Sequence, residues 1–433
     1  MTSGPESCGH GRNLESDTAM EKPVSDIVKR SHGCPVMNFD YAKIRPCGSY
    51  RQKAIELRDQ GTPIWVNEFA QGFWVVTAQE LVREVYLKPE IFTTDSVMAV
   101  EPETDPRHIL LPLNVNPPHH HKYRSLLAPW FSVARVKELE PLLRQSAREL
   151  IEGFRDTGQV DAAWDFCALL PINSLLRAAN MPMSVAPQLM QAINDFTRGF
   201  SGLEATETGG TAAMDAAVEA IHAVTDQMIA ERRARPLDNE NDFYTYLTTE
   251  LVEGRPLTDD EIRQIGLIYV VAGMETIRAQ LGWLLYHMAK VPQDRQRVLA
   301  DPSLIPAAVE ESIRYYTVIW GVGRKIGQDV HWHGVDLKKG DMIYALNDAY
   351  NRNPKRFENP DVFDLDRKQA PHLSFGLGAH SCIGMHLART QLVVALEEFH
   401  RLIPDYSIGP DAELKERGSE VTIQSLPLVW QVL

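Results

Sequence analysis

The residues with the clearest chemical potential lie in one run, Phe375-Gly376-Leu377-Gly378-Ala379-His380-Ser381-Cys382-Ile383-Gly384. Cys382 stands between glycines, directly before a periodic helical stretch from Met385 to Phe399. The positive end of that helix and its unpaired backbone N–H groups are expected to lower the pKa of the thiol and favour the thiolate. The glycines leave room for a flat, bulky ligand against the backbone. A soft thiolate beside such a space is what an iron porphyrin requires from one side.

The pattern Phe-Gly-x-Gly-x-His-x-Cys-x-Gly resembles the haem-binding loop of the cytochrome P450 family. A free cysteine taken alone is more often a small buried apolar residue, but six flanking positions match here as well. The resemblance covers roughly residues 40 to 433 and is nearest to the soluble bacterial group typified by camphor 5-monooxygenase. It implies haem b as the cofactor, Cys382 as the axial ligand of its iron, and Phe375 and Gly384 as haem contacts.

A second constellation, Ala272-Gly273-Met274-Glu275-Thr276, interrupts an apolar stretch. A carboxylate and a hydroxyl in such a place are costly unless they are satisfied. The motif is similar to the family's oxygen-activation segment. The resemblance implies that Thr276 hydrogen-bonds iron-bound dioxygen, that Glu275 relays protons and that Ala272 lies against the haem. For the motif alone, the alternative is a threonine bonded back to its own helix beside an ordinary buried ion pair.

Basic side chains stand at the four positions where the family contacts the haem propionates, namely His120, Arg124, Arg324 and His380. Two buried carboxylates need such partners, because charge-assisted hydrogen bonds are the stronger kind. His120 is also the middle one of three consecutive histidines, a run that suggests a metal site. Neighbours on a helix diverge by about 100°, so the three side chains cannot converge on one ion.

Glu311 and Arg314 match the family's Glu-x-x-Arg, and the resemblance implies that Arg367 completes a structural network bracing the cysteine loop. A pair at this spacing is otherwise usually a solvated surface ion pair. The substrate pocket rests on the resemblance alone. It is expected at His108, Val271, Trp320 and Val421, with His108 near the position of a substrate-anchoring tyrosine.

The elements that must position these residues are mostly helical. Apolar periodicity predicts helices near residues 136–154, 212–235 and 258–291; the last begins with a capping box of Thr258 and Glu261 and ends at Pro292. Residues 64–67 and 72–76 predict a hairpin followed by Thr77 as a helix cap, and residues 330–346 predict a small sheet. We expect a mainly α protein with the cytochrome P450 fold, one large helical domain with a small β-rich region over residues 39–433, after a disordered lead-in at 1–38.

Composition excludes several other classes of protein. The 433 residues carry a net charge of −14, which argues against a general nucleic-acid binder. No apolar run reaches the roughly 20 residues that span a bilayer, so no membrane anchor is expected. The five cysteines share no metal-type spacing, which favours a reduced, cytoplasmic setting over a disulfide framework.

The predicted function is that of a haem-thiolate monooxygenase, which inserts one atom of O2 into a C–H bond of a hydrophobic small molecule such as a terpenoid, an aromatic, a steroid or a fatty acid. No flavin or iron–sulfur domain is fused, so a separate ferredoxin, of the 2Fe-2S type, and its NAD(P)H-dependent reductase are expected to supply electrons to a monomer. A basic patch of His121, Lys122, Arg124, His386 and Arg389 is the hypothesised docking site. The alternatives are a peroxide-dependent peroxygenase, against which the Glu275–Thr276 pair speaks, and a non-catalytic haem-based sensor.

Overall fold

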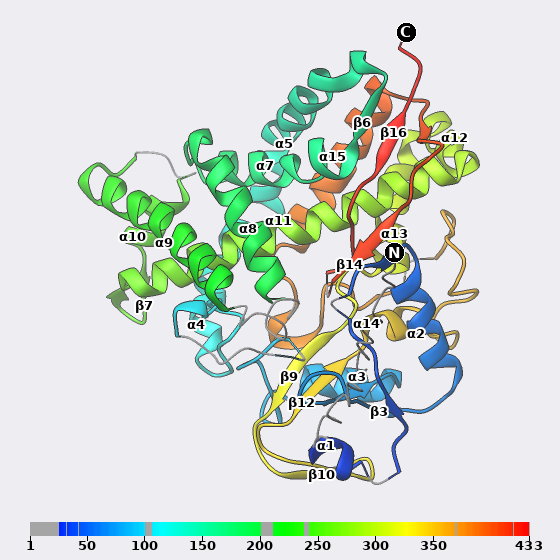
Figure 1. Cartoon of the computed structure of the whole chain (residues 1–433). Coiled ribbons are helices and arrows are strands. Elements are labelled where there is room, and N and C mark those ends of the chain that lie inside the picture. The colour runs from blue at the N-terminus through cyan, green and yellow to red at the C-terminus, as the bar shows by residue number, and fades with distance from the viewer. Residues whose placement is uncertain are drawn as a thin grey trace, which may run out of the picture.

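The computed structural model describes residues 26–432 except 32, 42, 99, 101–105, 201–210, 238–241, 369 and 419. Helices build most of the molecule, and a six-stranded sheet with several short two- and three-stranded ones builds the rest (Figure 1). The predicted mainly α architecture with a small β-rich region is therefore confirmed.

The α-helices are α1 Asp26–Lys29, α2 Ser49–Asp59, α3 Gln79–Leu87, α4 His120–Leu127, α5 Val133–Phe154, α6 Ala162–Asp165, α7 Leu169–Ala178, α8 Ala186–Phe200, α9 Thr211–Ala234, α10 Phe243–Thr249, α11 Asp259–Lys290, α12 Pro292–Ala300, α13 Ile305–Tyr316, α14 Asn347–Asn351 and α15 Met385–Leu402. The strands are β1 Val36–Met37, β2 Arg45–Pro46, β3 Ile64–Asn67, β4 Phe73–Val76, β5 Phe92–Thr93, β6 Gln159–Asp161, β7 Leu251–Val252, β8 Arg255–Pro256, β9 Val322–Ile326, β10 Val330–Trp332, β11 Val335–Leu337, β12 Met342–Ala345, β13 Ser407–Ile408, β14 Lys415–Arg417, β15 Thr422–Ile423 and β16 Pro427–Val429.

Helix α11 is the axis of the helical part, and it crosses the molecule beneath α7 and α8 (Figure 1). It begins with the predicted capping box: Thr258 Oγ1 accepts from the N–H of Glu261 at 3.2 Å, and Glu261 Oε2 accepts from the N–H of Thr258 at 2.8 Å. Its 32 residues extend about 48 Å at 1.5 Å per residue. Nearly every residue from Met274 to Ala289 is buried, so the middle of this helix belongs to the core.

Helix α15 follows the cysteine loop, which we define as residues 375–384, and packs against α5 and α13. Near its far end Glu398, whose side chain is almost fully buried, pairs with Arg144 and Arg148 of α5 and with Arg401. Burial and these hydrogen bonds act on the carboxyl in opposite directions, and the arginines prevail, holding the pKa of Glu398 at about 2. The loop is thus followed by a firmly anchored helix.

The larger sheet has the strand order β1-β3-β4-β12-β9-β5. The predicted hairpin of β3 and β4 is antiparallel, with Ile64 opposite Val76, and β12 lies parallel to β4. Its strands β3 and β4 are buried on both faces: Trp65, Phe73 and Val75 pack into a core shared with the helices, whereas the alternate residues, Ile64, Val66, Trp74 and Val76, form a separate core. Through β9 the sheet also carries Arg324, opposite Ile343 of β12.

Two sequence predictions about the N-terminal region are wrong. Thr77 does not cap a helix, because its hydroxyl donates to the carbonyl of Thr62 at 2.7 Å and Ala78 occupies the N-cap of α3. The lead-in is shorter than predicted, because β1 pairs with β3 and Arg30 bonds Asp341 at 2.8 Å. The fold therefore includes residues from 26 onward, while the rest of the predicted lead-in, 1–25, lies outside the described residues.

Candidate functional site

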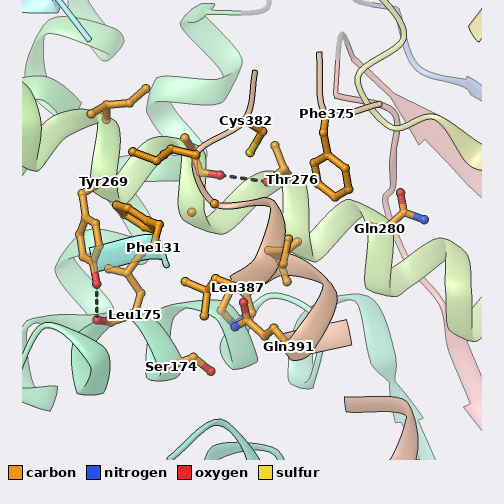
Figure 2. A pocket seen from close by; sticks show the side chains of 18 of the residues that line it. Phe131, Ser174, Leu175, Tyr269, Thr276, Gln280, Phe375, Cys382, Leu387 and Gln391 are labelled. Carbon is orange, nitrogen blue, oxygen red and sulfur yellow. Dashed lines mark hydrogen bonds between the residues drawn. The ribbon is translucent and has the colours of Figure 1, made fainter. Parts of the chain in front are cut away.

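A cavity of about 290 Å³ lies between α7, α11, α15 and the cysteine loop. Figure 2 shows Cys382 and Thr276 at one end of it and Ser174 and Gln391 toward the other. Most of its wall is apolar, and the contributing side chains include Phe131, Leu175, Phe243, Ile265, Ile268, Tyr269, Ile277, Leu387 and Leu392. A large flat or apolar guest fits such a space better than a polar one.

The backbone of the cysteine loop is closed by a bond from the N–H of Cys382 to the carbonyl of Phe375 at 2.8 Å. Gly376 and Gly378 have φ values of +69° and +75°, which a residue with a side chain rarely adopts. A Cβ on Gly378 would also lie 3.2 Å from the carbonyl oxygen of Tyr86 in α3. These two glycines are therefore required by the loop's own conformation and by α3, whereas the sequence analysis assigned them to ligand space.

Cys382 lines the cavity, and its thiol does not have the lowered pKa that the sequence analysis expected. Burial raises the pKa of the Cys382 thiol, and the N–H of Gly384 and the charges of Arg124 and Arg389 offset only part of that rise. A metal deprotonates a thiol that coordinates it. The arrangement thus favours a thiolate bound to a metal over a free thiolate.

Thr276 lies on the part of α11 that lines the cavity, and its hydroxyl donates to the carbonyl of Ala272 at 2.9 Å. The neighbouring Glu275 is buried on another side of the helix, where Thr422 Oγ1 donates to Oε1 at 3.0 Å and Arg278 Nη1 to Oε2 at 3.4 Å. The guanidinium of Arg278 stacks on Trp164, with its Cζ 4.0 Å from the ring centroid. Both features of the purely structural alternative are therefore present, although the threonine oxygen still has lone pairs to offer.

Four basic side chains, His120, Arg124, Arg324 and His380, gather beside the cysteine loop, and we call them the basic rim. The rings of His120 and His380 are 4.2 Å apart, and both ring nitrogens of His120 are buried without a hydrogen-bond partner. Burial lowers the pKa of His120 to about 4 and that of His380 to about 3, and it also lowers the pKa values of both arginines. Among the described residues no carboxylate pairs with any of the four, so the rim is a site prepared for an anion.

Glu311, Arg314 and Arg367 meet on the outer side of the loop. Glu311 accepts two bonds from Arg314, at 2.7 and 2.8 Å, and another from Arg367 at 2.9 Å. Arg314 also donates to the carbonyls of Asn351 and Pro360. The network fastens the segment before the cysteine loop to α13, and its three members are not among the described residues that line the cavity.

Comparison with known proteins agrees with this geometry. The cytochrome P450 family model matches residues 208–401. The mycinamicin IV hydroxylase/epoxidase of Micromonospora griseorubida is 31% identical over 377 residues, which cover 84% of this chain and 90% of that protein. The chain belongs to the cytochrome P450 family. It is accordingly an oxidoreductase of the monooxygenase type, and its cofactor is haem b.

Solved structures place this P450 within the same family at the level of the fold. The crystal structure of CYP101J2 superposes with a TM-score of 0.82 at 29% identity, covering 92% of this chain and 97% of that one. The crystal structure of cytochrome P450 CYP101C1 gives a TM-score of 0.80 at 30% identity with the same coverage. Both superpose over nearly the whole of this chain, so the predicted cytochrome P450 fold is confirmed.

The residues present fit a haem in this P450. The apolar cavity opens to the Cys382 sulfur. Arg124 and Arg324, which pair with no carboxylate among the described residues, have the two positive charges that two propionates require, and His120 can donate a hydrogen bond. His120, Arg124, Arg324 and His380 would hold the propionates, while Phe375, Ala272 and Gly384, which all line the cavity, would contact the ring. Both ring nitrogens of His120, buried without a partner, are the strongest sign that a polar ligand belongs here.

The four residues expected around the substrate do not line the described cavity. His108 lies 2.7 Å from Asp215 of α9, and the indole N–H of Trp320 donates to the carbonyl of Tyr50 in the core. Val421 is buried against the core, and Val271 packs at the edge of the helical core. The side chains that do line the cavity, such as Phe131 and Leu175, come from helices whose approach the sequence did not reveal.

Sequence reasoning missed two groups of polar partners. Thr422 and Arg278 hold the carboxylate of Glu275, and their only signal was the spacing of Arg278 three residues after the glutamate. Glu310 bonds Arg389 and His372 beside the loop, although sequence analysis placed Arg389 in a docking patch. Lys122 of that patch likewise pairs with Glu253 at 2.8 Å, whereas His121 and His386 are exposed.

Within the described residues, no helix has the length and apolar content to cross a bilayer.

Proposed function

We propose that Cys382 is the axial thiolate ligand of the haem iron and that this P450 inserts one oxygen atom of O2 into a C–H bond of a hydrophobic small molecule. The observation that carries the proposal is the shared cavity: Cys382 enters it from the loop and Thr276 from α11, beside the unpaired basic rim. When bound, the haem supplies the binding and activation of dioxygen. The residues of the chain orient the reactants, exclude water and hold protons.

Thr276 is the proton-holding group on the cavity side of α11. Its hydroxyl now donates to the carbonyl of Ala272, which keeps Oγ1 fixed and leaves its lone pairs to accept a bond from a group in the cavity. A rotation about one bond turns the hydroxyl hydrogen toward the cavity instead. Thr276 thus presents a proton at Oγ1 without a charge that the apolar walls would penalise.

Glu275 is proposed to deliver protons to Thr276 from the protein side. Its carboxylate is bound by Thr422 at 3.0 Å and more loosely by Arg278 at 3.4 Å, and it does not line the cavity. Delivery therefore requires the side chain to leave Thr422 and turn toward the threonine. Beyond Arg278 lies the exposed ring of Trp164, so the Glu275 group is buried close to the solvent on this side of α11.

The substrate is proposed to be an apolar small molecule of the terpenoid, aromatic, steroid or fatty-acid kind. Phe131, Leu175 and Ile268 give the cavity walls that bind such a molecule by burial of its apolar surface. Few polar side chains interrupt them. Ser174, whose hydroxyl is buried without a partner, together with Gln280 and Gln391, could meet a single polar group of the substrate.

Electrons are proposed to come from a 2Fe-2S ferredoxin, which an NAD(P)H-dependent reductase keeps reduced. Ion pairs neutralise part of the positive charge of the docking surface that the sequence suggested, because Lys122 pairs with Glu253 and Arg389 pairs with Glu310. His121 and His386 remain exposed there. Steering by charge should then be weak, so we expect the rate of electron transfer to fall only modestly from low to high salt.

The proposal is tested by turnover in isotopically labelled dioxygen. A panel of hydrophobic compounds is first screened for a low-to-high-spin shift of the ferric protein. Those that shift are incubated with ferredoxin, its reductase, NAD(P)H and the labelled gas, and we expect one labelled oxygen atom in the product. Turnover that is faster with peroxide alone would identify a peroxygenase. Spin shifts without any substrate-dependent oxygen consumption would identify a sensor.

A further inference from the structure

Next to the network of Glu311, its neighbour Glu310 forms a separate cluster that faces the cysteine loop. Arg389 of α15 donates two bonds to it, from Nε to Oε2 at 2.7 Å and from Nη2 to Oε1 at 2.8 Å. His372 Nε2 lies 2.9 Å from Oε1. We call Glu310, His372 and Arg389 the Glu310 cluster. It joins three elements that the chain order separates: α13, the segment before the loop, and α15.

The protonation pattern of the cluster is fixed by its geometry. His372 Nδ1 accepts the backbone N–H of Ser374 at 3.2 Å, so the ring proton is on Nε2 and is donated to Glu310. Burial on its own would raise the pKa of Glu310, but the bonds from Arg389 and His372 outweigh it and hold that pKa at about 2. The carboxylate is therefore permanently charged, and Arg389 balances it with one positive charge.

The Glu310 cluster contacts Phe375, the first residue of the cysteine loop. The guanidinium of Arg389 lies over the ring of Phe375, with Cζ 4.5 Å from the ring centroid, and the ring of His372 lies 5.8 Å from that of Phe375. The carbonyl of Phe375 in turn accepts the N–H of Cys382 at 2.8 Å. Arg389 also acts on Cys382 through space, because its charge opposes the rise that burial causes in the pKa of the thiol.

We propose that the Glu310 cluster is a positioning device in which each of two opposite charges offsets the effect of the other on the reduction potential of the haem bound to Cys382. The inference rests on the proposed ligation by Cys382. Glu310 contributes a negative charge beside the cysteine loop, Arg389 contributes a positive one between Glu310 and Phe375, and the two charges would act on the potential of a bound haem in opposite directions. Charges and hydrogen bonds beside a thiolate ligand tune the potential of its iron. Arg389 is then committed to the loop, and it is not a free cation on a docking surface.

The test uses single substitutions that unbalance the pair in opposite directions. Glu310→Gln removes the negative charge and leaves Arg389 uncompensated, so the ferrous state is favoured and the potential rises. Arg389→Gln removes the positive charge and lowers the potential. The double variant falls between them, near the native value. Each single change is expected to alter the ratio of ferrous to ferric haem at a fixed solution potential several-fold.

A matched control lies on the same helix. Glu398 is also a buried carboxylate held by arginines, but it is nine residues from Arg389, about 14 Å along α15. Glu398→Gln should weaken the fold without moving the potential. If Glu310→Gln does not fold, Arg389→Lys replaces it: lysine keeps the charge, so its potential should stay close to native while that of Arg389→Gln falls.

The readouts are a spectroelectrochemical titration and the ferrous–CO Soret band of every haem-loaded variant. The expected result is opposite shifts for Glu310→Gln and Arg389→Gln, or the lysine–glutamine contrast at 389, with a thiolate-type band throughout. Shifts in the same direction, no shift, or an equal shift in Glu398→Gln would overturn the inference. A native band that lacks the thiolate signature would instead refute ligation by Cys382, so the two failures are distinguishable.

Discussion

The two polar sites that support the cavity from behind, one beside the cysteine loop and one on α11, are held in different ways. On the cysteine side, Glu310 and Glu311 each accept bonds from arginines at 2.7 to 2.9 Å, and the loop is fixed from several elements at once. On the α11 side, Glu275 has one good bond, from Thr422, and a longer one from Arg278. Among the described residues, the hydroxyl of Thr276 bonds only its own helix.

The difference follows from what each side has to do. A ligand atom that must stay at one distance from a metal gains from a network whose members hold each other in place. A group that hands on protons must break its own bonds in every cycle, and single hydrogen bonds worth about 1 kcal/mol permit that. Substitutions on the cysteine side should therefore change stability, whereas those on α11 should change the outcome of the reaction.

The largest effect is expected from Glu311→Gln. The change removes the partner of Arg314 and Arg367, and Arg314 is almost completely buried. Leaving one buried charge unpaired costs about 3–5 kcal/mol. Urea unfolding of the haem-loaded protein, followed by circular dichroism and by the Soret band, should show that loss. A midpoint equal to the native one would mean that the network does not brace the loop.

A smaller effect, visible in acid, is expected from His400 near the end of α15. Burial, aided by Arg295, lowers its pKa to about 4, well below the usual value of about 6.5. The unfolded chain therefore takes up this proton first, and native stability is lost as the pH falls from about 6.5 toward 4. The contribution is about 2 kcal/mol between pH 7 and pH 5. His400→Gln should lose less stability than the native protein over that interval; equal losses would contradict the assignment.

Thr422→Val probes the loosely held side. It removes the hydroxyl that donates to Glu275 and keeps the shape, so the carboxylate retains only the longer bond from Arg278. We expect a stability loss of about 1.5 kcal/mol, the worth of a hydrogen bond to a charged group. The pH dependence of turnover should also change, because the carboxyl group is freer to turn. Thr422→Ser is the control, and a native-like valine variant would show that Thr422 does not hold Glu275.

Thr276→Ala should leave stability within about 1 kcal/mol of native, because alanine suits a helix at least as well as threonine. The substitution should change the outcome of the reaction. Reducing equivalents are still consumed, but a larger share of them is used to form peroxide and a smaller share to form product. The ratio of peroxide to product measures this, with Thr276→Ser as the variant that keeps the hydroxyl. Full coupling in the alanine variant would remove Thr276 from proton delivery, and a large stability loss would break the contrast between the two sides.

Local signals in the sequence predicted much of the fold. Thr258, Glu261 and Pro292 marked both ends of α11, because caps and proline act within a turn of the residues they affect. No signal in the sequence indicated which segments pair over a long distance along the chain. Residues 26–37 contain no long apolar or periodic run and were predicted as part of the lead-in, yet Arg30 pairs with Asp341, 311 positions away, and β1 pairs with β3. A parallel pairing that involves the two residues of β1 is too short to leave a periodic pattern in the sequence.

The same distinction between local and long-range signals applies to the candidate site. Cys382 and Thr276 stood out because a thiol among glycines and a hydroxyl in an apolar helix are unusual. Glu310 did not, because a glutamate on a helix looks the same in the sequence whether it faces solvent or an arginine of another helix. Here the packing of α15 brings Arg389 against it. The substrate-pocket residues were predicted only from the positions that they match in the family. Trp320 shows the limit, because its indole finds the carbonyl of Tyr50 in the core and turns away from the cavity.

The central claim is that the sulfur of Cys382 binds the haem iron. The most direct measurement is the ferrous–CO spectrum of the native protein and of Cys382→Ala, both expressed with ample haem precursor. The account predicts a red-shifted, thiolate-type Soret band in the native protein and its complete loss in the variant. A thiolate-type band that survives in Cys382→Ala, or a native band of the type given by a nitrogen ligand, would contradict it.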